Sequence, residues 1–240
     1  MKKNLLTMTL IIMLAAGGLL NASWLDDAKL QAEDKLEPLV ADIGAGISGA
    51  VIANAIQAKF PSVEAGIRFS VAKISDDNDI VDEDILPVPL ASARIGLPLG
   101  ISLFASGMSY EIADAGEKLQ IFGVGATYTV LKGKDMTPIP DVNAVLAVNM
   151  LSVTDIKVNV TTIGCVASRK LPIITPYVGI TYDMTSGSID TIAGKVEPSK
   201  NLFRIAAGVD MKPFPFMFLN AGISNLGYEL GTGLRISLPI

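Results

Sequence analysis

Eight charged side chains fall on the polar face of strand-like segments, and their signs balance. Four are arginines and four are carboxylates. Because an unpaired charge in an enclosed interior is costly, we expect these groups to form a hydrogen-bonded network across a lumen. We expect the network to fill and stiffen that interior; the alternative is that some of the arginines line a constriction that selects small solutes. The eight residues are Glu64, Arg68, Arg94, Asp183, Arg204, Asp210, Glu229 and Arg235.

Catalytic motifs are missing from the sequence. The chain contains no histidine, which excludes enzymes whose general base is histidine. Gly44, Gly46 and Gly49 are not part of a phosphate-binding loop. The acidic run 76–84 has one Asp-x-Asn step of a calcium loop but lacks its glycine and its terminal glutamate, so we expect a solvated loop. We therefore expect no enzyme activity, no cofactor and no metal site.

The C-terminal segment shows most clearly what positions these charges. Residues of one parity are apolar, and those of the other parity are mainly Gly, Asn, Ser and charged residues. Successive side chains of a strand point to opposite faces, so this segment has one apolar and one polar face. Small polar residues suit a crowded barrel lumen, whereas a soluble sandwich would carry many Lys and Glu on its outer face. The apolar set is Leu226, Tyr228, Leu230, Leu234, Ile236, Leu238 and Ile240.

Ten such alternating segments follow one another from Ser62 onward. An even number is typical of bacterial single-chain barrels, so we predict an all-β transmembrane antiparallel β-barrel of about ten strands. A twelve-strand barrel that uses two N-terminal strands is the alternative. Mean hydropathy is high, at +0.48, yet beyond the N-terminus we find no apolar run long enough for a spanning helix. The predicted strands are 62–74, 87–97, 101–112, 119–131, 141–152, 157–169, 173–185, 201–212, 216–224 and 226–238.

The chain divides into three parts. Residues 1–22 carry two lysines and then an apolar run that ends in small residues, which predicts a cleaved signal peptide and export to the bacterial outer membrane. Residues 23–61 form a helical or Gly-rich segment, and residues 62–240 form the barrel. The net charge is −5 and becomes more negative when the signal peptide is removed, so nucleic acid is not an expected partner.

The conformation of residues 38–60 is open, because both helical and strand periods fit them. Counted as a strand, this segment would make eleven and break the even number. We therefore place it, helical or irregular, inside the barrel or at its periplasmic mouth, as a plug. The candidate plug residues are Asp42, Gly44, Gly46, Gly49 and Asn54.

Connections and aromatic residues predict the orientation of the barrel. Short turns with proline alternate with longer or acidic loops, and in barrels of this kind the short turns face the periplasm. Five aromatic residues lie at the strand ends assigned to the outer surface, where they would form a girdle at the membrane interface. One of them, Tyr110, requires a slip of register near Gly107. The girdle residues are Tyr110, Phe122, Tyr182, Phe203 and Tyr228.

The middle of the chain resembles a family of uncharacterised bacterial outer-membrane β-barrel proteins. The matching segments lie within about residues 85–185 and are Ile95-Gly-Leu-Pro-Leu-Gly100, Leu131-Lys-Gly133 with Pro138 and Pro140, and 168–182. The resemblance implies a barrel with a signal peptide and periplasmic ends, and it implies no activity or binding residues. Such barrels usually end in an aromatic residue that is recognised during assembly. This chain ends in Leu238-Pro239-Ile240, so its signal to the barrel assembly machinery is atypical.

These features favour a passive role in the envelope. We expect an outer-membrane protein, in contact with lipid, that serves envelope structure or the passage of a small or apolar solute, with residues 42–54 as a movable hatch. The alternative is a surface interaction or adhesion protein that uses loops 75–86 and 186–200. The sequence leaves open the solute, whether the lumen is open, and the oligomeric state.

Overall fold

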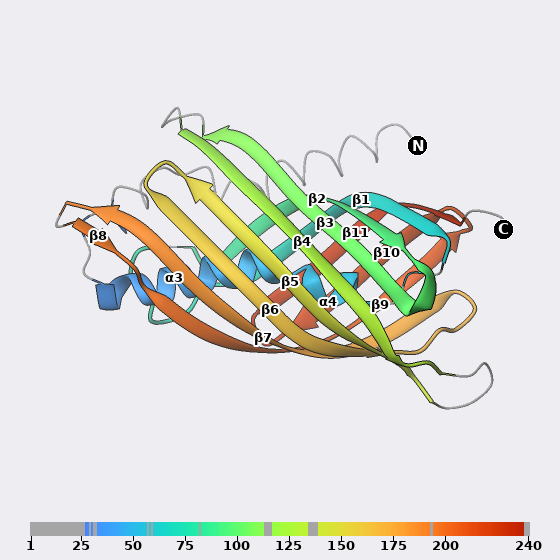
Figure 1. Cartoon of the computed structure of the whole chain (residues 1–240). Coiled ribbons are helices and arrows are strands. Elements are labelled where there is room, and N and C mark those ends of the chain that lie inside the picture. The colour runs from blue at the N-terminus through green and yellow to red at the C-terminus, as the bar shows by residue number, and fades with distance from the viewer. Residues whose placement is uncertain are drawn as a thin grey trace.

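The structure is a computed structural model of the chain (Figure 1). It describes residues 27–28, 30, 33–56, 58, 60–81, 83–112, 117–133, 139–192 and 194–237. The expected signal peptide and the C-terminal tripeptide 238–240 lie outside these ranges.

Ten long antiparallel strands form a closed wall in the described part of the chain. Each strand pairs with its neighbour in sequence, and β1 closes the wall by pairing with β11. This confirms the predicted ten-strand antiparallel barrel and removes the twelve-strand alternative. The wall strands are β1 (Ser62–Lys73), β2 (Ile85–Gly96), β3 (Ile101–Ile112), β4 (Glu117–Leu131), β5 (Asp141–Val153), β6 (Ile156–Ser168), β7 (Ile174–Thr191), β9 (Ser199–Phe214), β10 (Met217–Ser224) and β11 (Gly227–Ser237).

The wall has two different ends. The first residue of β1 and the last residue of β11 lie at the end that we call the turn end, together with the β2–β3 turn, which is a single 3-10 turn, η2 (Pro98–Gly100). The opposite end, which we call the loop end, carries the β1–β2 connection and the β7–β9 connection. In the latter, β7 continues to Thr191 and pairs with a short strand, β8 (Gly194–Val196). The prediction of a plain loop over residues 186–200 was therefore wrong, because this segment is an extended hairpin.

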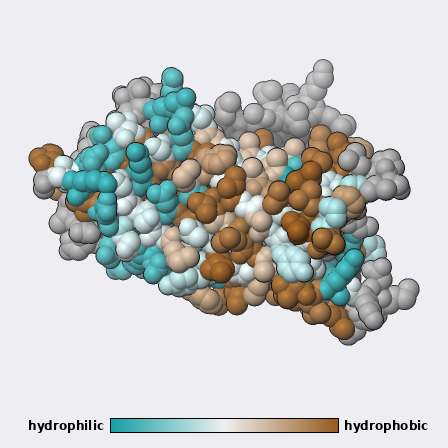
Figure 2. All heavy atoms as spheres, in the orientation of Figure 1, coloured by the Kyte–Doolittle hydropathy of each residue, from teal (hydrophilic) through white to brown (hydrophobic). Residues whose placement is uncertain are grey.

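The alternation of side chains changes character along the strands, as β6 illustrates. Toward the turn end, Ile163 and Cys165 are exposed on the outer face, while Thr162 is buried inside. Toward the loop end the pattern inverts: Lys157 faces outward and Val158 inward. On the face shown in Figure 2, apolar residues gather over the part of the barrel away from β8, and hydrophilic residues gather near β8. The wall therefore has an apolar outer band next to the turn end and a polar outer surface near the loop end.

The interior of the barrel holds a helical segment. It consists of α3 (Glu33–Ser48) and α4 (Val51–Asn54), and we call residues 33–56 the plug. This confirms the expected N-terminal helical segment in the lumen. The stretch Lys35–Asn54 has a hydropathy of 1.5 and is apolar enough to span a membrane, contrary to the sequence-based expectation, but 94% of its most apolar window is buried inside the barrel.

The plug runs from the loop end to the turn end. At its start, the Lys35 ammonium donates a hydrogen bond of 2.7 Å to Asp79 in the β1–β2 connection. Just beyond its end, the Ala58 backbone N–H donates to the Ser102 hydroxyl near the β2–β3 turn. Figure 1 shows the same direction, with α3 beginning at the end that carries β8 and α4 lying toward the opposite end.

Candidate functional site

The plug fits the lumen because glycines face the wall at the points of closest approach. A Cβ atom on Gly44 would lie 2.7 Å from the Thr185 side chain, and one on Gly46 would lie 2.9 Å from Val88. A Cβ on Gly49 would overlap the Ser70 hydroxyl oxygen. The other two candidate plug residues, Asp42 and Asn54, are also buried. All five residues thus lie in the lumen.

Arg204 on β9 holds the middle of the plug. Its guanidinium donates hydrogen bonds of 2.9 Å to the Ala45 carbonyl and to the Ser48 hydroxyl, and it forms an ion pair of 3.1 Å with Asp183. The Ser48 hydroxyl in turn donates to Asp183 at 3.0 Å. A cation beside the last turn of α3 satisfies a helix carbonyl and interacts favourably with the helix dipole. Wall and plug are therefore joined by charge-assisted hydrogen bonds, which are the strong ones.

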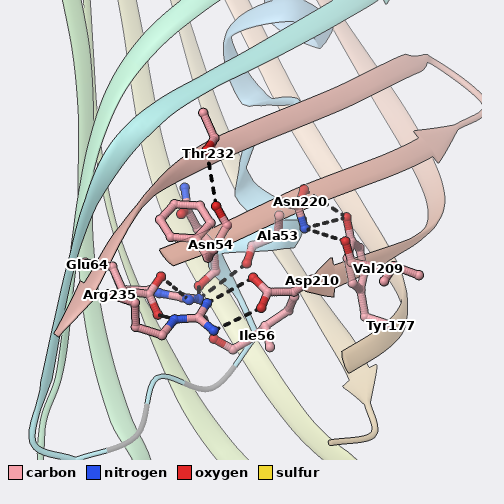
Figure 3. Close-up of polar contacts among 12 residues, drawn as sticks. Ala53, Asn54, Ile56, Glu64, Tyr177, Val209, Asp210, Asn220, Thr232 and Arg235 are labelled. Atoms are coloured by element: carbon pink, nitrogen blue, oxygen red, sulfur yellow. Dashed lines mark hydrogen bonds and ion pairs between the residues drawn. The ribbon is translucent and has the colours of Figure 1, made fainter. Parts of the chain in front are cut away.

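A second cluster closes the lumen at the far end of the plug (Figure 3). Arg94 donates a hydrogen bond of 2.6 Å to the Ile56 carbonyl and one of 3.1 Å to the Asn54 carbonyl. Its other nitrogen pairs with Glu64 at 2.6 Å. Glu64 also accepts a hydrogen bond from Arg235, which forms a two-bond pair with Asp210 at 3.0 Å each. Four of the predicted network residues are thus connected with the end of the plug.

The remaining two predicted charges, Arg68 and Glu229, form an ion pair with 2.9 Å between Arg68 Nη1 and Glu229 Oε1. The Phe218 ring lies 5.4 Å from the guanidinium carbons of both Arg68 and Arg235, within the range of cation–π attraction. Phe218 and the buried Tyr177, which bonds to Asn220, were missed by the sequence analysis. Their position on the inward parity of β10 and β7 could have revealed them.

The start of the plug is held by the β1–β2 connection. Asp42 accepts hydrogen bonds from the Asn78 amide, at 2.8 Å, and from the Ser75 backbone N–H, at 3.1 Å. Ile80 is buried in the same apolar cluster as Leu39 and Val40 of the plug. The described part of this connection therefore packs on the plug rather than forming the fully solvated loop that we expected. No group of three or more potential metal ligands occurs among the described residues.

Spaces of very different size border the described plug. A vestibule of about 950 Å³ opens at the turn end and stops at Ile56 and the Glu64–Arg235–Asp210 cluster. A cavity of about 280 Å³ lies at the loop end beside the turn between β10 and β11. A gap of about 10 Å³ lies between Gly49 and Ile52 of the plug and Tyr177 and Glu229 of the wall. Every residue from Leu39 to Ile56 is buried, so in the described part of the chain the plug fills the middle of the lumen.

Four of the five predicted girdle residues have exposed side chains on the outer face of the wall. They are Phe122, Tyr182, Phe203 and Tyr228. The prediction that Tyr110 lies on the outer face was wrong, because its side chain is partly buried against the apolar cluster inside the loop end. The ladder between β3 and β4 runs without a break from Ile101 to Ile112, so the slip near Gly107 does not occur. At this height the interior is apolar and the outward positions are polar, which inverts the parity rule that we applied.

Comparison with known proteins gives a family and a set of structures. Residues 78–238 match the family described as "Family of unknown function (DUF6588)". The chain belongs to this family. The family description states no activity, in agreement with the resemblance to an uncharacterised barrel family, and no curated protein matches the chain.

The comparison with solved structures found proteins from several bacteria. Ail, the attachment invasion locus protein of Yersinia pestis, is 15% identical with a TM-score of 0.33, and the alignment covers 73% of this chain and 97% of Ail. Neisserial surface protein A is 15% identical with a TM-score of 0.32 over 74% of this chain and 96% of that protein. A mutant porin of Rh. blastica is 8% identical with a TM-score of 0.23, covering 72% and 99%. These values are too low to transfer the role of any of these proteins to the present chain.

Proposed function

We propose that this chain is an outer-membrane protein that takes up an apolar or amphipathic solute through the side of its barrel. The outer-membrane setting is supported by the apolar outer band. Successive outward positions of a strand carry exposed apolar side chains, as Leu146, Val148 and Met150 do on β5. A closed wall satisfies its backbone hydrogen bonds internally, which is the condition for strands to lie in hydrocarbon. The expected signal peptide would deliver the chain to the periplasm for insertion.

The route along the axis is blocked at both levels of the plug. Arg204 and Asp183 hold the end of α3, and Arg94 and Glu64 hold the residues after α4. These groups are buried, so breaking one pair leaves an uncompensated charge in a poorly solvated place. This arrangement supports a barrel that is closed to ions and water in its resting state.

The observation that carries the proposal is a low point in the wall beside the loop-end cavity. β10 ends at Ser224, which pairs with Ala206 of β9, while β9 continues past it to Ser199. The short β10–β11 turn, with Asn225 and Leu226, therefore borders the cavity with an edge that lies lower than the end of β9. A solute in the outer half of the membrane would reach the cavity over this edge.

The lining of the cavity indicates which solute fits. Its apolar side includes Ala41, Ala45, Leu202 and Leu226. Its polar side includes two lysines and the carboxylates of Asp42 and Asp76, of which Asp42 already accepts hydrogen bonds from the β1–β2 connection. Apolar walls with a few placed polar groups are typical of small-molecule sites. The lysines are suited to an anionic group, as in a long-chain fatty acid, while the apolar side receives the chain. These lysines are Lys73 and Lys200.

The test is saturable binding of a fluorescent long-chain fatty acid by the purified protein in lipid nanodiscs. Leu226→Trp places a larger side chain in the cavity and should weaken binding by about tenfold, the effect of roughly 1.4 kcal/mol. Leu234→Trp, at an exposed position of the outer face, is the matched control and should leave binding unchanged. Equal affinity in the two variants, or no saturable binding to the unmodified protein, would exclude this cavity as the solute site.

A second candidate function is surface interaction, favoured by the hairpin of β7, β8 and β9. Its outward positions are polar and extend past the apolar band, as at Ser186, Ser188 and Asp190. Replacing residues 187–198 by a short turn should abolish attachment to a host surface if the hairpin is adhesive. The fold would be retained, as monitored by heat-modifiable migration in gels. Unchanged attachment would eliminate this candidate.

A further inference from the structure

The direction of the plug determines where the N-terminal segment leaves the barrel. We infer that the chain threads the barrel from outside to inside, so that residues 27, 28 and 30 and the start of α3 lie on the cell-surface side while both ends of the barrel wall face the periplasm. This inference shares the outer-membrane setting with the proposed function and is independent of any solute.

The first support is the position of the residues before and at the start of α3. Ala28 is buried in the same cluster as Val153, Ile156 and Ile189, which belong to strand ends at the loop end. Lys35 contacts Asp79, and Asp42 contacts Asn78. The chain thus approaches the plug from the loop end, although β1 itself starts at the turn end.

The second support is the position of the loop end relative to the apolar band. Near the loop end the outward positions are polar, such as Lys157 and Asn159 on β6, and the inward positions are apolar, such as Val158 and Val160. This is the pattern of a protein in water with its own core. At the turn end, by contrast, outward Ile95 is exposed close to the β2–β3 turn. The loop end projects into water, as the extracellular ends of such barrels do, and the turn end stays close to the membrane.

Threading also explains the lumen's fit to a helix. An α-helix with side chains is about 10–12 Å across, and glycines reduce this width where Gly44, Gly46 and Gly49 meet the wall. A lumen that holds one helix is wide enough for one polypeptide segment, so α3 can lie along the barrel axis with its start at the loop end.

Cysteine labelling in intact cells tests the inference. Cys165, the single cysteine of the chain, is first replaced by serine, and the Cys165→Ser protein is the background for the other variants. Three single substitutions are then compared: Leu30→Cys before the plug, Asp77→Cys at the loop end and Leu171→Cys at the turn end. All three residues are exposed, Leu30 to 67%. The reagent is a maleimide that does not cross the outer membrane, applied before and after the membrane is permeabilised.

The inference predicts that positions 30 and 77 react in intact cells to a similar extent and that position 171 reacts only after permeabilisation. It is overturned if position 30 behaves as position 171 does, or if position 171 reacts in intact cells and position 77 does not. A protein that binds no fatty acid can still give the expected labelling, so the two proposals fail separately.

Cross-linking in the purified, folded protein gives an independent reading of the threading direction. In the Cys165→Ser background, Lys35→Cys combined with Asp79→Cys should be joined by a short bismaleimide. Lys35→Cys combined with Leu171→Cys is the control and should stay unlinked. Linkage of 35 to 171, or failure of 35 to link to 79, would contradict a plug that enters from the loop end.

Discussion

The guanidinium of Arg94, on the barrel wall, donates a hydrogen bond of 2.6 Å to the carbonyl oxygen of Ile56, where the plug ends. The same side chain pairs with Glu64 of the neighbouring strand. One arginine therefore connects the closing seam of the wall, through Glu64 and Arg235, with the segment that fills the lumen.

Replacing Arg94 should loosen the plug. In Arg94→Met the carbonyls of Asn54 and Ile56 lose their donor, and Glu64 keeps only Arg235 as a partner. Breaking a buried pair typically costs about 3–5 kcal/mol. We expect a lower urea midpoint for unfolding in detergent. Arg169→Met, at an exposed position near the turn end, is the control and should change the midpoint little. Equal midpoints for both variants would show that Arg94 does not hold the plug.

Adding one methyl group to the plug should destabilise the barrel. In Gly49→Ala the new Cβ collides with the Ser70 hydroxyl and lies 2.9 Å from the Ser70 Cβ. Overpacking of this kind costs about 1–3 kcal/mol. The double variant Gly49→Ala, Ser70→Gly removes both contacts and should recover most of the loss, measured as the free energy of unfolding. If the two changes simply add, the plug does not lie against β1.

The wall was predictable because its signal is local. A period of two residues marks each strand, and the predicted strand 101–112 has the observed bounds of β3. The same parity placed all eight network charges on the inward face, where they are buried. Which arginine pairs with which carboxylate could not be predicted from parity, because it depends on the register between strands that are distant in sequence. Arg68 of β1, for example, forms its ion pair with Glu229, a diagonal neighbour on β11.

The misplacement of Tyr110 has a physical cause. Parity predicts an outward apolar face only where hydrocarbon surrounds the wall. Beyond the apolar band water surrounds it, so apolar residues turn inward, as Tyr110 and Ile189 do. The direction of the plug was also invisible, because the period of a helix carries no information about which mouth of the barrel it enters.

Neutralising one lysine of the loop-end cavity should weaken the binding of an anionic amphiphile. Lys73→Gln removes a cation from the lining without changing the length of the side chain greatly. Contacts of exposed charges are worth about 1 kcal/mol or less, so we expect a loss of fatty-acid affinity of up to about fivefold. The loss should shrink in high salt. Lys118→Gln, on the outer face of β4, is the control. A neutral long-chain alcohol should bind with equal affinity to the unmodified protein and to both variants. A loss of alcohol affinity in Lys73→Gln would contradict a charge contact between Lys73 and the fatty acid.

Tryptophan placed at the girdle should report the membrane interface. In a Trp24→Phe background, which removes the single native tryptophan, we compare Tyr182→Trp and Phe203→Trp with Ile180→Trp. Tyr182 on β7 and Phe203 on β9 are paired neighbours on the outer face. They lie closer to the loop end than Ile180, which is the preceding outward-facing residue of β7. Lipids brominated near the headgroup should quench positions 182 and 203 most, and lipids brominated deep in the chains should quench position 180 most. The reverse order would place the apolar band elsewhere on the wall.

The most direct test of a barrel closed by its own N-terminal helix is conductance in planar lipid bilayers. The full mature protein is compared with a variant in which residues 38–56 are replaced by a short Gly/Ser linker, and refolding of both is checked by heat-modifiable migration. We predict no stepwise conductance from the full protein and clear ion-conducting steps from the variant, since the vestibule would then continue through the lumen. Steps of equal size from both proteins would contradict a plugged barrel.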